Sequence, residues 1–303
     1  MFRSLFRRDG AAEVGSASAP SAPVPTEPES ETAGRPLVPD LLALPPDPLV
    51  PEQATARPEN ALPGIIFNTV PKTGSVYILY TLARSLQLEV VNETHRLLHG
   101  YFPTFFLYPN IVQYTCTGQR IVQEHFDASP INVHILRRYT DRMLFQVRDP
   151  RQATLSWVHH MTRMLTEHPR SDQFTQTIPP ANYLDWELED KISWHIERHL
   201  PAMISFIEGW MDVQEQKDPD FRVEITAYER FRADEMAYFM EILDFYEIPR
   251  DQFHYDPAEK TEKTNFRHGQ SNEWQSVLTA AQQRRAEELI GPRVLALIDS
   301  LTG

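Results

Sequence analysis

Residues Gly64–Leu88, GIIFNTVPKTGSVYILYTLARSLQL, carry the pattern of a buried strand, a tight turn and an amphipathic helix. The apolar run Gly64–Val70 is bounded by prolines, which is typical of a short buried strand. Apolar residues then recur over Ser75–Leu88 at the spacing of one helical face. The backbone N–H groups and the dipole at the start of a helix attract anions, and Lys72 adds a full positive charge beside them. The stretch therefore predicts an anion-binding turn at residues 71–75.

This turn lacks the pattern that ordinary nucleoside triphosphatases use to hold phosphate. A Walker A loop has the form G-x-x-x-x-G-K-[ST], whereas residues 71–75 read PKTGS, so an ordinary ATPase or GTPase is disfavoured. A plain strand–turn–helix with a solvated lysine remains the alternative. Lys72 is the first lysine in the chain and the next is Lys191, with arginine supplying the positive charges between them. A compact ammonium at this place indicates a point-charge role toward an anion.

Length and composition limit the class of protein. The chain has 303 residues and 41% hydrophobic content, which is enough for one large α/β domain or two small ones. A formal net charge of -13 argues against a nucleic-acid partner, because nucleic acid favours a basic surface. The single cysteine, Cys116, excludes an internal disulfide framework and predicts a reducing, cytoplasmic setting. No apolar run approaches the roughly 20 residues that span a bilayer, so we expect no transmembrane segment.

Residues 1–60 differ in composition from the rest of the chain. They hold eleven of the 25 prolines and almost no aromatic residues, which predicts a disordered tail. The remainder, 61–303, is interpreted as one domain in which strands and helices alternate. Further strands are expected at 89–92, 121–123, 143–147 and 221–226, and helices at 131–139, 151–165, 186–216, 233–245 and 280–301. Such alternation predicts a mainly parallel sheet whose ligands bind at the carboxyl ends of the strands.

Two further segments carry residues suited to anions. The predicted strand 143–147 runs into Arg148, and Ser156 follows in the second turn of the next predicted helix. A guanidinium and a hydroxyl at these places can grip one phosphate, although a salt bridge at the sheet rim is the ordinary role of such an arginine. Near the carboxyl terminus, Arg267 and the backbone of Gly269 lie in a polar stretch ahead of the last helix. These residues predict a second and a third set of anion contacts.

The three motifs, in order, resemble those of the cytosolic-type sulfotransferase family. Residues 71–77, PKTGSVY, look like its 5′-phosphosulfate loop, P-K-[ST]-G-T-T-W. Residues 148–160, RDPRQATLSWVHH, resemble its 3′-phosphate motif, R-[ND]-P-x-D-x-x-x-S-x-x-x-H. Residues 266–279, FRHGQSNEWQSVLT, are similar to its loop R-K-G-x-x-G-D-W-K-x-x-[FL]-T. The resemblance implies an α/β, P-loop-like three-layer fold, in which a short central parallel sheet is flanked by helices.

The same resemblance implies a reaction and a set of donor-binding residues. A sulfuryl group moves from 3′-phosphoadenosine 5′-phosphosulfate (PAPS) to a hydroxyl or amine, and adenosine 3′,5′-bisphosphate (PAP) is released. The family's positions correspond here to Lys72, Thr73, Gly74, Ser75 and Val76 at the 5′-phosphosulfate, Tyr77 beneath the adenine, Arg148, Ser156, Arg267, His268 and Gly269 at the 3′-phosphate, and Tyr228 near the nucleotide. Tyr77 stands where the family has tryptophan, and His268 where it has lysine. The histidine brings less positive charge unless it is protonated.

The family's base histidine, in K-T-H-L-P, corresponds to His125, which follows the predicted strand 121–123. A histidine has an ordinary pKa suited to taking a proton near neutral pH. In glycan-type relatives a glutamate does this work, so Glu124 is an alternative base, and His134 is another. Sulfuryl transfer, like phosphoryl transfer, depends mostly on positioning and on charge stabilisation, which Lys72 would supply at the leaving oxygen. This chemistry requires no metal.

The acceptor and two other functions stay open at this point. A small molecule or a glycan is the expected partner, and the aromatic stretch 101–108 fits a pocket wall and ordinary core packing equally well. One alternative function is a kinase, a nucleotide-dependent phosphoryl transferase with a variant P-loop. The other is a nucleotide-binding interaction module without turnover. Two histidine pairs, His95 with His99 and His195 with His199, have the i, i+4 spacing of metal ligands but no further ligand signature.

Overall fold

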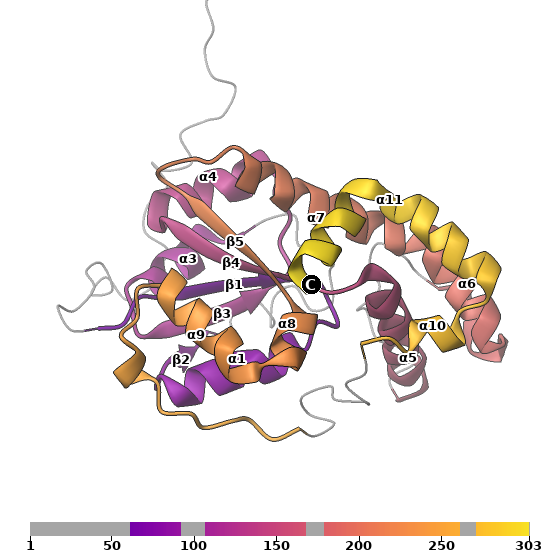
Figure 1. Ribbon diagram of the computed structural model, residues 1–303, viewed down its shortest axis with the longest axis horizontal. Helices are drawn as coiled ribbons and strands as arrows, with labels where there is room; N and C mark the ends of the chain where they lie inside the picture. Colours follow the sequence, from indigo (N-terminus) through magenta and orange to yellow (C-terminus); the bar gives the residue numbers. More distant parts are fainter. Residues whose placement is uncertain (1–60, 92–106, 168–178, 261–270, 303) are drawn as a thin grey trace, which may run out of the picture. The chain divides into compact units, whose positions relative to one another are not determined.

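The structure, a computed structural model, describes residues 61–91, 107–167, 179–260 and 271–302 (Figure 1). Its five strands form one sheet in the order β2-β3-β1-β4-β5, and every neighbouring pair is parallel. The strands are β1 (Ile65–Thr69), β2 (Glu89–Val90), β3 (Arg120–Glu124), β4 (Arg142–Val147) and β5 (Arg222–Ala227). The α/β fold with a short central parallel sheet, predicted from the sequence, is confirmed.

Helices cover both faces of the sheet (Figure 1). One face is packed by α1 (Ser75–Ser85), α8 (Tyr228–Ala233) and α9 (Glu235–Phe245), and the other by α3 (Pro109–Cys116), α4 (Pro130–Tyr139), α7 (Leu200–Glu215) and α11 (Ala280–Thr302). Helices α5 (Pro150–Glu167), α6 (Leu188–Arg198) and α10 (Trp274–Val277) extend the second layer by packing on its helices and on one another. Phe67 and Leu144 face the first layer, whereas Ile66 and Phe145 face the second. Burial on both faces explains why the strands read as continuous apolar runs.

The centre of the sheet determines where a ligand can bind. The chain leaves β1 and returns on one side as β3 and on the other side as β4, so the strand order reverses at β1. In open α/β sheets, ligands bind at such a switch point, beyond the carboxyl ends of the strands. Here those ends are followed by the turn at 71–74, by His125 and by Arg148. The topology therefore brings three separate predicted elements to one edge.

Two expected helices differ from those observed. The region 186–216 is two helices, because Pro201 has no N–H to continue the ladder of α6 and instead occupies the first turn of α7. The region 233–245 begins later, at α9, where the Asp234 side chain caps the helix by accepting from Ala237 N at 2.9 Å. Helix α3, with Pro109 in its first turn, was not predicted.

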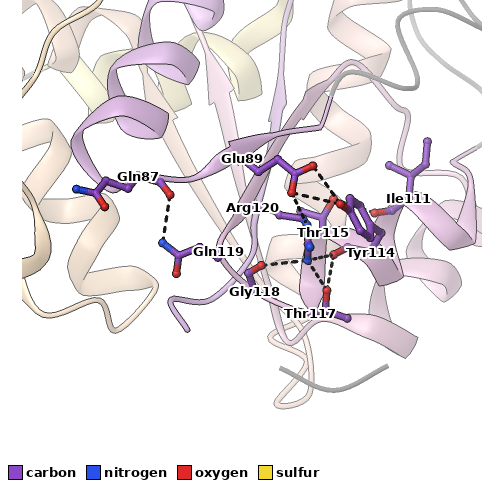
Figure 2. A network of polar contacts seen from close by, with 9 residues as sticks. All are labelled: Gln87, Glu89, Ile111, Tyr114, Thr115, Thr117, Gly118, Gln119 and Arg120. Atoms are coloured by element: carbon purple, nitrogen blue, oxygen red, sulfur yellow. Dashed lines mark hydrogen bonds and ion pairs between the residues drawn. The ribbon is translucent and has the colours of Figure 1, made fainter. Parts of the chain in front are cut away.

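The amino end of β3 is fixed by a polar network around Arg120 (Figure 2). Its Nε donates to Glu89 on the edge strand β2 at 3.0 Å, and its guanidinium lies 3.8 Å from the centre of the Tyr114 ring. One terminal N–H group also donates to the Thr117 hydroxyl at 2.6 Å and to the carbonyl oxygens of Tyr114 and Gly118. The network holds the short strand β2 and helix α3 at the end of the sheet opposite the predicted site.

Several predictions fall on residues that the structure does not describe. The tail 1–60, most of the aromatic stretch 101–108 and the pair His95 and His99 lie outside the described residues. Within the described ranges, no helix is long and apolar enough to cross a membrane. The same ranges contain no group of three or more His, Cys, Asp or Glu residues arranged to hold a metal ion.

Candidate active site

The turn after β1 has a backbone that few residues can adopt. Lys72 and Gly74 both have positive φ angles, of 70° and 74°. A Cβ atom on Gly74 would lie 2.8 Å from the Tyr228 ring, so this position needs glycine for space as well as for conformation. The Thr73 hydroxyl donates to Val70 O at 2.9 Å and closes the turn. Helix α1 then begins without a side-chain cap, as an anion-binding helix start does.

Side chains from β4 and from the residue directly after it orient the peptide groups of this turn. Gln146 Nε2 donates to Thr73 O at 2.6 Å, and Arg148 donates to Lys72 O at 2.8 Å. The Tyr238 hydroxyl in turn donates to Gln146 Oε1 at 3.0 Å, which fixes the amide. In a trans peptide the C=O and the next N–H point in opposite directions, so the N–H groups of Thr73 and Gly74 face away from these side chains. The carbonyls of the turn are thus hydrogen-bonded by side chains, and its N–H groups point away from those side chains.

Arg148 and Tyr228, predicted from separate motifs, meet at this turn. The Arg148 guanidinium lies 4.2 Å from the centre of the Tyr228 ring, and the same ring contacts Gly74. Both side chains are buried. Glu229, next to Tyr228, accepts a hydrogen bond from Asp149 N at 3.3 Å; burial raises its pKa, and the Arg148 charge opposes that rise. A cation, an aromatic face and the turn therefore share one small region.

His125 is held against the end of β1 by a hydrogen bond from its Nδ1 atom. Its Nδ1 lies 2.6 Å from Thr69 O, and because a carbonyl oxygen can only accept, Nδ1 carries the proton. The neutral ring then has its lone pair on Nε2. The Thr69 hydroxyl lies 3.2 Å from Nδ1 and accepts from Gln123 Nε2 at 3.1 Å. The structure thus fixes the His125 ring against Thr69, which lies two residues before the turn, and in the neutral ring Nε2 is the basic nitrogen.

Glu124, the alternative base, is a buried carboxyl group. The carboxyl group is buried, and this burial raises its pKa to about 8. At neutral pH the group is mostly protonated, so it cannot take a proton before it loses one. His134, the other alternative, is exposed on α4. Of the three, His125 alone combines a fixed ring orientation with a position next to the turn.

Tyr77 is held in place by its hydroxyl group. The hydroxyl donates to Glu235 Oε1 at 2.7 Å, and the ring packs 5.7 Å from the Phe231 ring. Burial and the Glu235 carboxylate raise the pKa of Tyr77 well above its ordinary value, so the phenol stays a donor. Lys260 Nζ lies over the ring, 4.8 Å from its centre. The aromatic face predicted to stack on adenine is therefore covered by an ammonium group.

Sequence reasoning gave no role to His160, although it lies within electrostatic reach of Lys72. Burial, together with the charges of Lys72 and Arg163, lowers the pKa of His160 to about 3, so the ring is neutral at ordinary pH. Ser156, predicted for the 3′-phosphate and only partly buried, is one turn earlier on α5 and shares its face. The i, i+4 spacing from Ser156 was the available signal. The neighbouring Trp157 ring lies 5.4 Å from the His160 ring.

The third motif is only partly described. Arg267, His268 and Gly269 lie outside the described residues, so their predicted contacts stay predictions. Trp274, which follows them, packs on the first turn of α5. The backbone N–H of Trp274 donates to Gln152 Oε1 at 3.1 Å, and the Arg151 guanidinium lies 3.8 Å from the centre of the indole ring. The residues that resume at 271 therefore lie beside the helix that carries Ser156.

Comparison with known proteins assigns the family. The model of the sulfotransferase domain matches residues 62–297. The chain belongs to this family. It is accordingly a sulfotransferase, and the resemblance seen in its three motifs is confirmed. No curated protein matches the sequence significantly.

The chain is similar to solved structures of sulfotransferases at low sequence identity. Mouse sulfotransferase SULT7A1, in a crystal structure complexed with PAP, has a TM-score of 0.51 and 11% identity, over 82% of this chain and 90% of that one. A sulfotransferase from Alicyclobacillus acidocaldarius has a TM-score of 0.39 and 17% identity, over 76% of this chain and 96% of that one. A sulfotransferase domain from the Synechococcus PCC 7002 olefin synthase has a TM-score of 0.43 and 12% identity, over 79% of this chain and 97% of that one. At 11% identity, the likeness to the mouse enzyme concerns the fold alone.

Proposed function

We propose that this sulfotransferase uses PAPS as its donor and transfers the sulfuryl group to a hydroxyl or amine of a small molecule or glycan, releasing PAP. The observation that carries the proposal is the set of hydrogen bonds from Gln146 and Arg148 to the carbonyl oxygens of the turn. They leave the N–H groups of Thr73 and Gly74 facing away from these side chains, next to Lys72 and to the uncapped start of α1. Such an arrangement suits a phosphosulfate.

The described residues fit this donor. Lys72, Thr73, Gly74, Ser75 and Val76 would hold the 5′-phosphosulfate through backbone N–H groups and the lysine charge, since they form the start of α1. Arg148 and Ser156 would meet the 3′-phosphate, with Arg267, His268 and Gly269 completing that contact. Tyr77 and Tyr228 would flank the nucleoside. When bound, PAPS supplies an activated sulfuryl group on a good leaving phosphate.

The protein's own groups then do the remaining work. Lys72 and the turn N–H groups stabilise the negative charge that develops on the leaving oxygen, and they are oriented before the reaction starts. His125 takes the proton of the acceptor through Nε2, because its Nδ1 proton is committed to Thr69 O. Glu124, mostly protonated at neutral pH, does not compete for this role. No step needs a metal ion.

One observation bears on the kinase alternative. In a Walker-type P-loop, the Ser or Thr hydroxyl after the lysine reaches the nucleotide-bound magnesium. Here the residue after Lys72 is Thr73, whose side chain is fully buried and donates to Val70 O. That hydroxyl therefore serves the turn itself.

A cytoplasmic setting fits the single cysteine, Cys116, which is half-buried.

Radiolabelled PAPS tests the proposal directly. The full chain is incubated with it and a panel of phenols, aliphatic alcohols, amines and sugars, and transfer of label is measured. A parallel series uses radiolabelled ATP with magnesium. Transfer of sulfur label to at least one acceptor class, with no phosphoryl transfer, is the expected result. Phosphoryl transfer alone would establish the kinase alternative, and tight PAP binding without turnover would favour the interaction module.

A further inference from the structure

The segment that follows α9 runs along α1 toward the candidate active site. His254 N donates to Ser85 O at 2.9 Å, and Asp256 N donates to the Ser85 hydroxyl at 2.9 Å. Ala258 N donates to the Thr81 hydroxyl at 3.1 Å. We name residues 253–260 the strap. Its backbone is bound to α1 at two successive turns of the helix.

The register of these contacts determines where the strap arrives. Ser85, Thr81 and Tyr77 are spaced by four residues, so they lie on one face of α1, one turn apart. Two residues of extended chain span about the same distance as one helical turn. Ala258 meets Thr81, and Lys260, two residues later, meets Tyr77. The strap therefore delivers an ammonium group to the aromatic ring nearest the start of α1.

A single carboxylate gathers the groups around this ammonium. Glu235 Oε1 accepts from the Tyr77 hydroxyl at 2.7 Å and from the Tyr255 hydroxyl at 2.9 Å. Its other oxygen lies 3.8 Å from Lys260 Nζ. The Lys260 side chain is 40% exposed, and an ion pair this long and exposed contributes little to stability. Lys260 is thus positioned over Tyr77 but is not tightly held there.

We infer that Lys260 is a donor-binding residue: the purine displaces its ammonium group from the Tyr77 ring, and the ammonium then binds the 3′-phosphate of the same nucleotide. This inference rests on the proposed function. An ammonium and a purine cannot occupy the same ring face, so binding must move Lys260. In a nucleoside 3′,5′-bisphosphate, the 3′-phosphate is the anion nearest the base. The flexible lysine stem is long enough for the displaced ammonium group to reach this phosphate.

The net negative charge of the chain favours a role for this lysine in binding an anionic nucleotide. The net charge of -13 opposes the approach of a polyanionic nucleotide, so local positive charge must compensate. His268 stands where the family has lysine and supplies less charge near neutral pH. Lys260 lies eight positions earlier in the chain. A cation supplied by the strap would restore the missing charge from a different backbone position.

The test compares PAP with adenosine 5′-monophosphate (AMP), which lacks the 3′-phosphate. Dissociation constants are measured by calorimetry on the full chain, for the wild type, for Lys260→Met and for Arg84→Met. Lys260→Met keeps the stem and removes the charge, so PAP should bind about tenfold more weakly, while AMP changes less than about twofold. Arg84→Met is the matched control. It removes the Arg84–Asp256 ion pair, which ties the same strap to α1.

Each outcome has a separate meaning. Arg84→Met should leave both constants near those of the wild type, with melting temperatures reported for all three proteins. The inference would be overturned if Lys260→Met lowered the affinities for PAP and AMP equally, or if both variants lowered the PAP affinity equally, since Lys260 would then be structural. Tighter PAP binding after Lys260→Met would also overturn it, because the lysine would then only obstruct the site. A wild type that binds no PAP would instead refute the proposed function.

Discussion

The carbonyl groups of the Lys72 turn and several side chains around it differ in how their hydrogen bonds are satisfied. The donor side comprises the turn and its β4 contacts, where the carbonyls of Lys72 and Thr73 each receive a side-chain hydrogen bond. The proposed acceptor side comprises Glu124, at the end of β3, and the neighbouring rings of Trp157 and His160 on α5. There, Glu124 Oε1, Trp157 Nε1 and His160 Nδ1 are buried, and none has a hydrogen-bond partner among the described residues. On the donor side the same holds for the side-chain atom Glu229 Oε2, but not for the carbonyls of the turn.

The difference indicates a division of labour. Leaving a buried polar atom unsatisfied costs about 1–3 kcal/mol, so several in one region are retained only where they serve something else. On the donor side, rigid orientation of the turn is what stabilises developing charge. On the acceptor side, unsatisfied neutral groups can meet the polar atoms of a substrate.

The largest effect is expected on the donor side, from Lys72→Met. The variant removes the charge from the turn but keeps the carbonyl that Arg148 contacts, so the fold should persist. Loss of charge stabilisation in the transition state lowers kcat by about a hundredfold to a thousandfold. Turnover of radiolabelled PAPS measures this, with the melting temperature as the control. Activity within twofold of the wild type would remove Lys72 from the mechanism.

His125→Ala tests the acceptor side. Loss of a general base lowers turnover by about a hundredfold or more, whereas PAP affinity should stay unchanged because His125 contacts the end of β1 rather than the turn N–H groups. Glu124→Gln is the matched comparison and should do much less. A larger loss of turnover from Glu124→Gln would make the glutamate the base, as in glycan-type relatives.

Arg148→Ala should separate the two phosphates of the donor. PAP binding weakens by about tenfold or more, because a charged, bidentate contact to the 3′-phosphate is lost. Binding of adenosine 5′-phosphosulfate, which has no 3′-phosphate, should change far less. Arg148 also donates to Lys72 O, so a purely structural arginine would weaken both ligands equally. Calorimetry with the two ligands decides between these outcomes.

The smallest effect concerns stability and pH at Glu124. Its pKa is raised to about 8 in the folded chain, above its ordinary value, so the folded state holds the proton more tightly than the unfolded state. Stability is then lost as the pH rises from about 4.5 toward 8. Glu124→Gln removes this penalty and should raise the melting temperature more at pH 8.5 than at pH 5. An equal shift at both pH values would contradict a protonated, buried carboxyl.

Local patterns predicted much of this arrangement, and tertiary contacts determined the rest. The 71–75 turn, Arg148 and Tyr228 were predicted because each follows a strand end or matches a motif. Gln146 and Tyr238 were missed, since their bonds join residues 73 and 92 positions apart and leave no local signal. The place of Lys260 over Tyr77 depends on the register of the strap along α1, which also has no signature in the sequence.

The most direct measurement is calorimetric binding of PAP, AMP and ATP with magnesium to the full-length wild type. A site built for a 3′-phosphorylated donor should bind PAP at least about tenfold more tightly than AMP, because the 3′-phosphate adds a charged contact. ATP with magnesium should bind no better than AMP. ATP with magnesium binding more tightly than PAP would contradict the account, since the turn would then serve a phosphoryl donor.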